Sequence, residues 1–182
     1  MTIPKLVATL WVVVLGLGAD WPQFRGPNAA GVAEEERLPV HFGPHAAVVW
    51  KTPLPMGPSS SSIAGERIFV TGLEDAKLTT FALERRTGRV LWRREAPRPR
   101  TQELQENNHP ASPTPATDGE NVYVFFADFG LLAYGPRGDE LWRLPLGPFN
   151  NPFGHGSSPI VSGDLVLQVC DQDEGSFIVA VE

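Results

Sequence analysis

The chain has 182 residues, of which 42% are hydrophobic, and this composition supports a globular domain with an apolar core rather than a disordered chain. Its 18 glycines and 18 prolines predict many turns, and therefore many short strands in place of long helices. The formal net charge of −6 argues against a basic surface for nucleic-acid phosphates, so no nucleic-acid partner is expected.

The N-terminus has the pattern of a secretory signal peptide. Lys5 precedes an apolar run over 6–17, and small residues follow before the polar Asp20. We expect a signal peptide over 1–19 that is cleaved after Gly18 or Ala19; a retained anchor is the alternative. The expected location is therefore periplasmic or secreted, in the cell envelope, with no stable membrane span after cleavage.

An extended N-terminal segment is expected over 20–46, before the repeats. The stretch 48–51 then has the pattern of an outer strand, since its VVWK is similar to the VLWR that ends at Arg93, yet no inner strands precede it. The chain's one cysteine, Cys170, excludes an intrachain disulfide, and its place in an apolar run indicates buried packing.

Three segments of the chain repeat one pattern. They open at Ser60, Ser112 and Ser158, and each turns at a glycine followed by an acidic residue before a β-branched and aromatic strand. A polar turn and another apolar strand follow, and the first two repeats close on Trp92 and Trp142, which lie 50 residues apart. Four short strands at this spacing are typical of a β-propeller blade, whereas helical repeats would need longer amphipathic runs.

The sequence therefore predicts an all-β fold, a partial β-propeller over 47–182. It comprises two complete four-stranded antiparallel blades and an incomplete third, over 57–96, 109–146 and 155–182, together with an orphan N-terminal outer strand. Two hairpins of an ordinary sandwich are the alternative. A tryptophan at the end of each fourth strand is expected to cover the junction with the next blade, because one sheet cannot bury its faces alone.

Six residues resemble the tryptophan-docking motif of pyrroloquinoline quinone (PQQ)-type propellers, Ala-x-Asp-x-x-Thr-Gly-Lys-x-x-Trp. They are Ala82, Glu84, Thr87, Gly88, Arg89 and Trp92, with Glu in place of Asp and Arg in place of Lys. A second, shorter copy has Ala133, Gly138 and Trp142. The stretch WPQFRGP from Trp21 is similar to the start of many secreted bacterial PQQ-like repeat proteins, which in turn resemble the assembly scaffold BamB.

This resemblance implies a closed ring with more blades than the chain contains. We therefore expect the chain to be a fragment or a truncated product, whose partners are the missing blades or another protein. Ring closure by oligomerisation is the alternative. A lone arc would expose blade faces and strand edges.

Two histidines are candidate ligand residues. His109 and His155 both open the pattern H-x-x-S-P at the same point of successive repeats, near the start of the innermost strand. They are expected at the mouth of the channel, where they would bind a ligand or a metal; the alternative is that they cap strand ends. The acidic run 171–176 resembles the opening of a calcium loop, although a solvated hairpin turn is favoured.

The resemblance also bears on function. Quinoprotein dehydrogenases hold PQQ with calcium on the propeller axis, and the alcohol-oxidising types add a disulfide of adjacent cysteines, which one cysteine cannot form. We therefore expect a non-enzymatic propeller segment, without catalytic residues or a cofactor of its own, that binds or scaffolds through loops and blade edges. The alternatives are a fragment of a PQQ-dependent dehydrogenase (an oxidoreductase, with PQQ and calcium) and a carbohydrate- or polymer-binding propeller.

Overall fold

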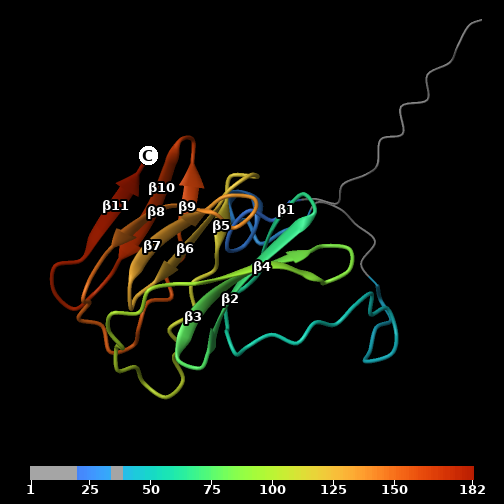
Figure 1. The fold of residues 1–182 in the computed structure, drawn as a ribbon, viewed down its shortest axis with the longest axis horizontal. Helices are drawn as coiled ribbons and strands as arrows, with labels where there is room; N and C mark the ends of the chain where they lie inside the picture. Colours follow the sequence, from blue (N-terminus) through green and yellow to red (C-terminus); the bar gives the residue numbers. More distant parts are fainter. Residues whose placement is uncertain (1–19, 34–38) are drawn as a thin grey trace, which may run out of the picture.

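The computed structural model describes residues 20–33 and 39–182. The regular secondary structure of these residues consists of β-strands and one short 3-10 turn (Figure 1). One short 3-10 turn, η1 (Pro27–Ala29), interrupts the N-terminal segment. The predicted signal peptide, 1–19, lies outside the described residues. The strands form three separate antiparallel sheets, which follow one another along the chain and in space.

The first sheet has four strands in sequential order. They are β1 (Ser62–Ala64), β2 (Arg67–Glu74), β3 (Lys77–Glu84) and β4 (Val90–Glu95). Strand β3 is one of the two inner strands of this sheet, and its residues between the two charged ends are buried on both faces. Because both faces of β3 are buried, its Leu, Thr, Phe and Ala residues do not alternate with charged residues, as they would in a strand with one face in solvent.

The second sheet repeats this arrangement. Its strands are β5 (Ala116–Thr117), β6 (Val122–Phe126), β7 (Gly130–Tyr134) and β8 (Glu140–Pro145), again in sequential order. Even the irregularities agree: the register shifts directly after the Ala82–Trp92 pair in the first sheet and after the Ala133–Trp142 pair in the second. A β-bulge at the same place re-aims the tryptophan in both sheets.

The third sheet has three strands, β9 (Ile160–Ser162), β10 (Leu165–Cys170) and β11 (Phe177–Val181), in the order β11-β10-β9. The prediction of two four-stranded blades and an incomplete third is therefore confirmed. One detail differs, because the stretch 48–51 is in no strand. Within the described residues no segment forms a hydrogen-bonded ladder with it, and a strand exists only as part of such a ladder.

Two apolar seams hold the sheets together. The first seam, between the first and second sheets, includes Phe69, Trp92, Val124, Phe126 and Tyr134. The second seam, between the second and third sheets, includes Phe125, Leu131, Phe149 and Cys170. Because neighbouring residues of β6 point to opposite faces, this one strand supplies both seams.

Candidate functional site

The tryptophan that closes the first sheet lies on a turn of the second. Trp92 is buried, and its Nε1 donates a hydrogen bond to the carbonyl of Pro136 at 3.1 Å. A Cβ on Gly138 would lie 2.7 Å from the indole, so only glycine lets the ring approach this turn. Arg94, two residues further along β4, donates to the carbonyl of Gly138 at 2.5 Å.

Trp50 makes the equivalent contact at the start of the described repeats. Its Nε1 donates to the carbonyl of Arg85 at 2.9 Å, and Thr52 donates to the carbonyl of Gly88 at 2.7 Å. A Cβ on Gly88 would lie 2.3 Å from the Trp50 ring. The turn itself is held by Thr87, which donates to Glu84 and thereby lowers the pKa of that carboxyl. The stretch 48–51 thus docks as an outer strand would, although it has no ladder.

Trp142 has the same register as Trp92, opposite a fully buried Ala133, but it is only half-buried. Its ring stacks over Tyr123 of β6, with centroids 6.0 Å apart. Trp92 meets Gly138 where the first two sheets adjoin, and Thr87 and Gly88 form the turn on which Trp50 lies. None of the residues that the sequence assigned to docking lines the cavity at His109 or the cavity at Val161. A docking role for the whole motif stays a prediction.

His109 lines a shallow cavity of about 310 Å³. Its Nδ1 accepts a hydrogen bond from the backbone N–H of Ala111 at 3.1 Å, which leaves Nε2 to carry the proton. Burial, followed by the charge of Arg98, lowers the pKa of this histidine. The other lining residues come from two loops, 56–58 and 106–108.

His155 lies elsewhere, in the second seam. Its ring is 5% exposed and packs edge-on against Phe149 and Phe125, with centroids 4.4 and 5.6 Å away. Burial lowers its pKa, and the charge of Asp171 opposes this shift. His155 does not line the His109 cavity, so the structure does not bring the two histidines into one cavity. A ligand role for either one stays a prediction.

The acidic run 171–176 forms a compact turn. Ser176 donates to Asp171 at 2.8 Å and accepts from the backbone N–H of Gln172 at 3.0 Å. Among the described residues, no three His, Cys, Asp or Glu side chains are grouped closely enough to hold a metal ion. The turn therefore has internal hydrogen bonds of the kind expected for a solvated hairpin.

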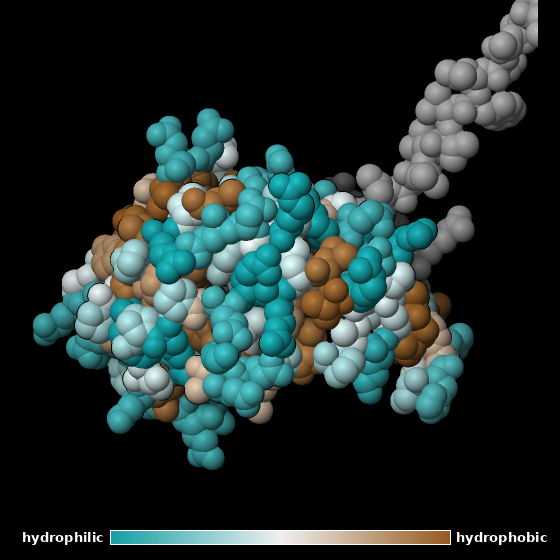
Figure 2. Space-filling view, viewed as in Figure 1, coloured by the Kyte–Doolittle hydropathy of each residue, from teal (hydrophilic) through white to brown (hydrophobic). Residues whose placement is uncertain are grey.

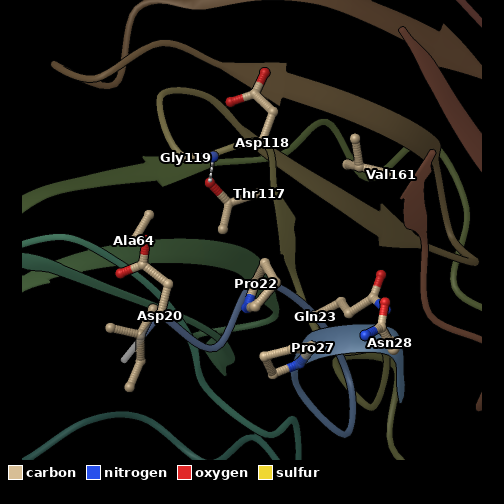
Figure 3. Close-up of a pocket in the computed structure, with 11 residues that line it drawn as sticks. Asp20, Pro22, Gln23, Pro27, Asn28, Ala64, Thr117, Asp118, Gly119 and Val161 are labelled. Carbon is tan, nitrogen blue, oxygen red and sulfur yellow. Dashed lines mark hydrogen bonds between the residues drawn. The ribbon is translucent and has the colours of Figure 1, made fainter. Parts of the chain in front are cut away.

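A larger cavity, of about 390 Å³, lies along the innermost strands of all three sheets (Figure 3). The N-terminal segment forms one wall and the three inner strands form the other. Its lining residues are Asp20, Pro22, Gln23, Pro27, Asn28, Ile63, Ala64, Thr117, Asp118, Gly119 and Val161. No sequence pattern predicts this cavity, because the stretch WPQFRGP indicates only a family resemblance.

The N-terminal segment is held there by backbone hydrogen bonds. Trp21 exchanges two of them with Ile63 of β1, at 3.0 and 2.8 Å. The carbonyl of Pro22 accepts from the backbone N–H of Thr117 in β5 at 2.8 Å. Asp20 accepts from the N–H of Gly65 at 2.8 Å. The segment therefore lies across the inner edges of the first two sheets.

The cavity has polar groups but no nucleophile with a base beside it. Asp118 accepts from the backbone N–H groups of Glu120 and Asn121 and from the hydroxyl of Tyr123. Burial alone would raise the pKa of Asp118, but these hydrogen bonds outweigh it, so the pKa is lowered and the group stays ionised. The cavity can bind a ligand through two carboxylates, two carboxamides and the apolar rings of Pro22 and Pro27. These groups assemble no catalytic triad.

No helix among the described residues has the length and the apolar character needed to cross a membrane. A comparison with curated proteins finds no significant match. Solved structures are similar in fold, at low sequence identity. BamB from Moraxella catarrhalis has a TM-score of 0.54 and 18% identity, over 74% of this chain and 40% of its own.

Two quinohemoprotein alcohol dehydrogenases are similar to the same degree. The enzyme from Comamonas testosteroni has a TM-score of 0.60 and 18% identity, over 91% of this chain and 26% of its own. The enzyme ADHIIG from Pseudomonas putida HK5 has a TM-score of 0.55 and 19% identity, over 74% of this chain and 20% of its own. The chain thus spans well under half the length of each of these structures.

The family described as outer membrane protein assembly factor BamB matches residues 9–181, nearly the whole chain. The match agrees with the three sheets, with the repeated bulge beside each tryptophan and with the glycine turns on which Trp50 and Trp92 lie. The chain therefore belongs to this BamB family of PQQ-like β-propeller repeat proteins.

Proposed function

We propose that the chain is a non-enzymatic propeller segment of the cell envelope that binds or scaffolds a protein partner, or further blades, through its loops and blade edges. The observation that carries this proposal is the unpaired edge of the third sheet. Strand β11 lies at the end of its sheet, and among the described residues no strand pairs with its outer edge.

This edge adjoins an exposed apolar surface. Four large apolar residues on one face of the third sheet, Ile160, Leu165, Val169 and Ile178, are each at least 39% exposed. Figure 2 shows apolar residues over that end of the molecule. An unpaired strand edge offers main-chain hydrogen bonds to an added strand, and the apolar side chains beside it offer area to bury. Both properties suit a polypeptide partner.

Site-directed cross-linking tests the proposal. A photoreactive amino acid at Ile178, which is 63% exposed, should give discrete cross-linked protein species in the envelope of the producing cells. The same probe at Arg86, on an exposed turn of the first sheet, is the control and should give few or none. Equal labelling at both positions would contradict the proposal.

A second measurement addresses the competing oxidoreductase function. Equilibrium titration of the chain with PQQ in the presence of calcium should show no saturable binding. Binding in the micromolar range, about −8 kcal/mol, would overturn the non-enzymatic function and favour a dehydrogenase fragment.

A further inference from the structure

The cavity in Figure 3 contains one equivalent residue from each repeat. Ile63, Thr117 and Val161 each lie two residues before the glycine of the turn that follows the innermost strand, and all three line the cavity. Their ladder positions agree, since they are opposite Ile68, Val122 and Val166 in the neighbouring strands. The backbone of each one is therefore expected to face the same way.

Two of these three positions already bind an extended peptide, which is the chain's own N-terminal segment. Both the N–H and the C=O of Ile63 bond to Trp21, and the N–H of Thr117 bonds to Pro22. These backbone groups point away from the ladder because, in an antiparallel pair, alternate residues direct their hydrogen bonds outward. The inner edge of each sheet is thus built to accept main-chain partners.

The third position has no such partner. Among the described residues, no backbone hydrogen bond from another segment reaches Val161, although its register is that of Ile63. The carboxamides of Gln23 and Asn28 lie on the Val161 side of the cavity, with Asp20 and Ala64 on the opposite side (Figure 3). Within the described structure neither carboxamide makes a hydrogen bond. One backbone donor, one backbone acceptor and two carboxamides therefore border the same space.

We propose that the inner edge of β9 at Val161 binds an extended segment of a partner polypeptide, which continues the path of residues 20–22 onto the third sheet. One residue of that segment would exchange two hydrogen bonds with Val161, as Trp21 does with Ile63. Carboxamides suit the remaining peptide groups because each offers both a donor and an acceptor. Two carboxylates and no basic residue among the lining residues favour a neutral or basic segment.

This inference rests on the proposed function, since it names a second surface for a polypeptide partner. A blocked synthetic peptide with the sequence of residues 20–25, DWPQFR, is the probe, because this sequence already occupies the two equivalent edges. Fluorescence anisotropy of the labelled peptide should show saturable binding to the full chain.

Val161→Pro is the decisive variant. It removes the N–H that faces the cavity, and proline is tolerated in an edge strand where the N–H faces away from the ladder. Val161→Ala keeps the N–H and is the matched control. The proline variant should bind the peptide about tenfold more weakly than the alanine variant. Equal affinity of the two folded variants, or no binding by the wild type, would overturn the inference.

Amide hydrogen exchange gives a readout that does not depend on the folding of the proline variant. The peptide should slow exchange at Val161 of the wild type, and exchange at Ile63 should be unchanged. The double variant Gln23→Ala/Asn28→Ala should weaken binding severalfold. Slowed exchange at Ile63 alone would mean that the peptide replaces the N-terminal segment, which also contradicts the inference. Cross-linking at Ile178 does not involve Val161, so its persistence would show that the proposed function survives.

Discussion

The two seams of this molecule use the same repeat and differ in how completely it is sealed. In the first seam, Trp92 is 8% exposed and contacts the rings of Phe69 and Tyr134, with centroids 6.0 and 5.9 Å away. In the second seam, the equivalent Trp142 is only half-buried. The motif provides the same strand and bulge in both places. The burial of the indole depends on a further contact, which for Trp92 is the turn at Gly138 in the next sheet.

The chain segments that connect neighbouring sheets also differ, and the one across the first seam is the more firmly anchored. After β4 the chain crosses to the second sheet and is anchored by a buried ion pair, Arg98 to Asp128 at 2.7 Å. After β8 it crosses to the third sheet and is anchored by amide groups, among them the backbone N–H of Asn150 donating to Gln172 at 2.9 Å. The first seam should therefore be the more stable of the two, and substitutions at the two tryptophans, at the Arg98–Asp128 ion pair, at Gly138 and at His155 probe this difference.

The largest effect is expected at the tryptophans. Trp92→Ala should lower the free energy of unfolding by about 3–5 kcal/mol, because it removes a buried indole from a packed seam. Trp142→Ala should cost about 1–2 kcal/mol, since the half-buried ring loses less apolar contact. Urea denaturation measures both values. Equal losses would mean that the two seams are sealed alike.

The buried ion pair comes next. Arg98→Met should cost about 3 kcal/mol, because Asp128 is 1% exposed and would be left as an uncompensated charge. The control is Glu140→Gln, which breaks the exposed pair with Arg143 and should cost less than about 0.5 kcal/mol. A small loss for Arg98→Met would show that this connection does not anchor the first seam.

A glycine substitution tests the turn beneath the indole. Gly138→Ala should cost about 2–3 kcal/mol, because φ is +76° and the added Cβ would lie 2.7 Å from Trp92. Gly163→Ala is the matched control, with φ of +59° and nothing within 4 Å of the added Cβ. It should cost only about 1 kcal/mol, from backbone strain. Thermal unfolding of the two variants gives the contrast.

The smallest effect concerns pH and the second seam. Burial lowers the pKa of His155 below its ordinary value of 6.5, so the folded state holds this ring neutral while the unfolded state binds a proton. Stability should therefore be unaffected by this group above pH 6.5 and fall as the pH drops below it, by at most about 1.4 kcal/mol per pH unit. His155→Phe should remove this slope in urea titrations at pH 7.5 and 5.5. An unchanged slope would assign the pH dependence to other groups.

The repeat was predictable because its signals are local. The glycine turns, the short β-rich strands and the tryptophan spacing each follow from short-range backbone and packing rules, so the three sheets could be anticipated. The placement of the histidines could not. His109 and His155 share one motif, yet one lines a cavity and the other packs between Phe125 and Phe149, because the surroundings of each come from distant segments.

The sequence by itself determined the repeated sheets, since the turn residues and the β-rich runs within some fifty residues mark each four-stranded unit. Only the tertiary structure decided where residues 20–22 lie. Their backbone groups bond to Ile63 and Thr117, which are distant along the chain, and no side-chain pattern encodes such main-chain contacts. The same holds for the open edge at Val161, because an unoccupied hydrogen-bonding position becomes visible only when its two occupied equivalents are seen beside it in space.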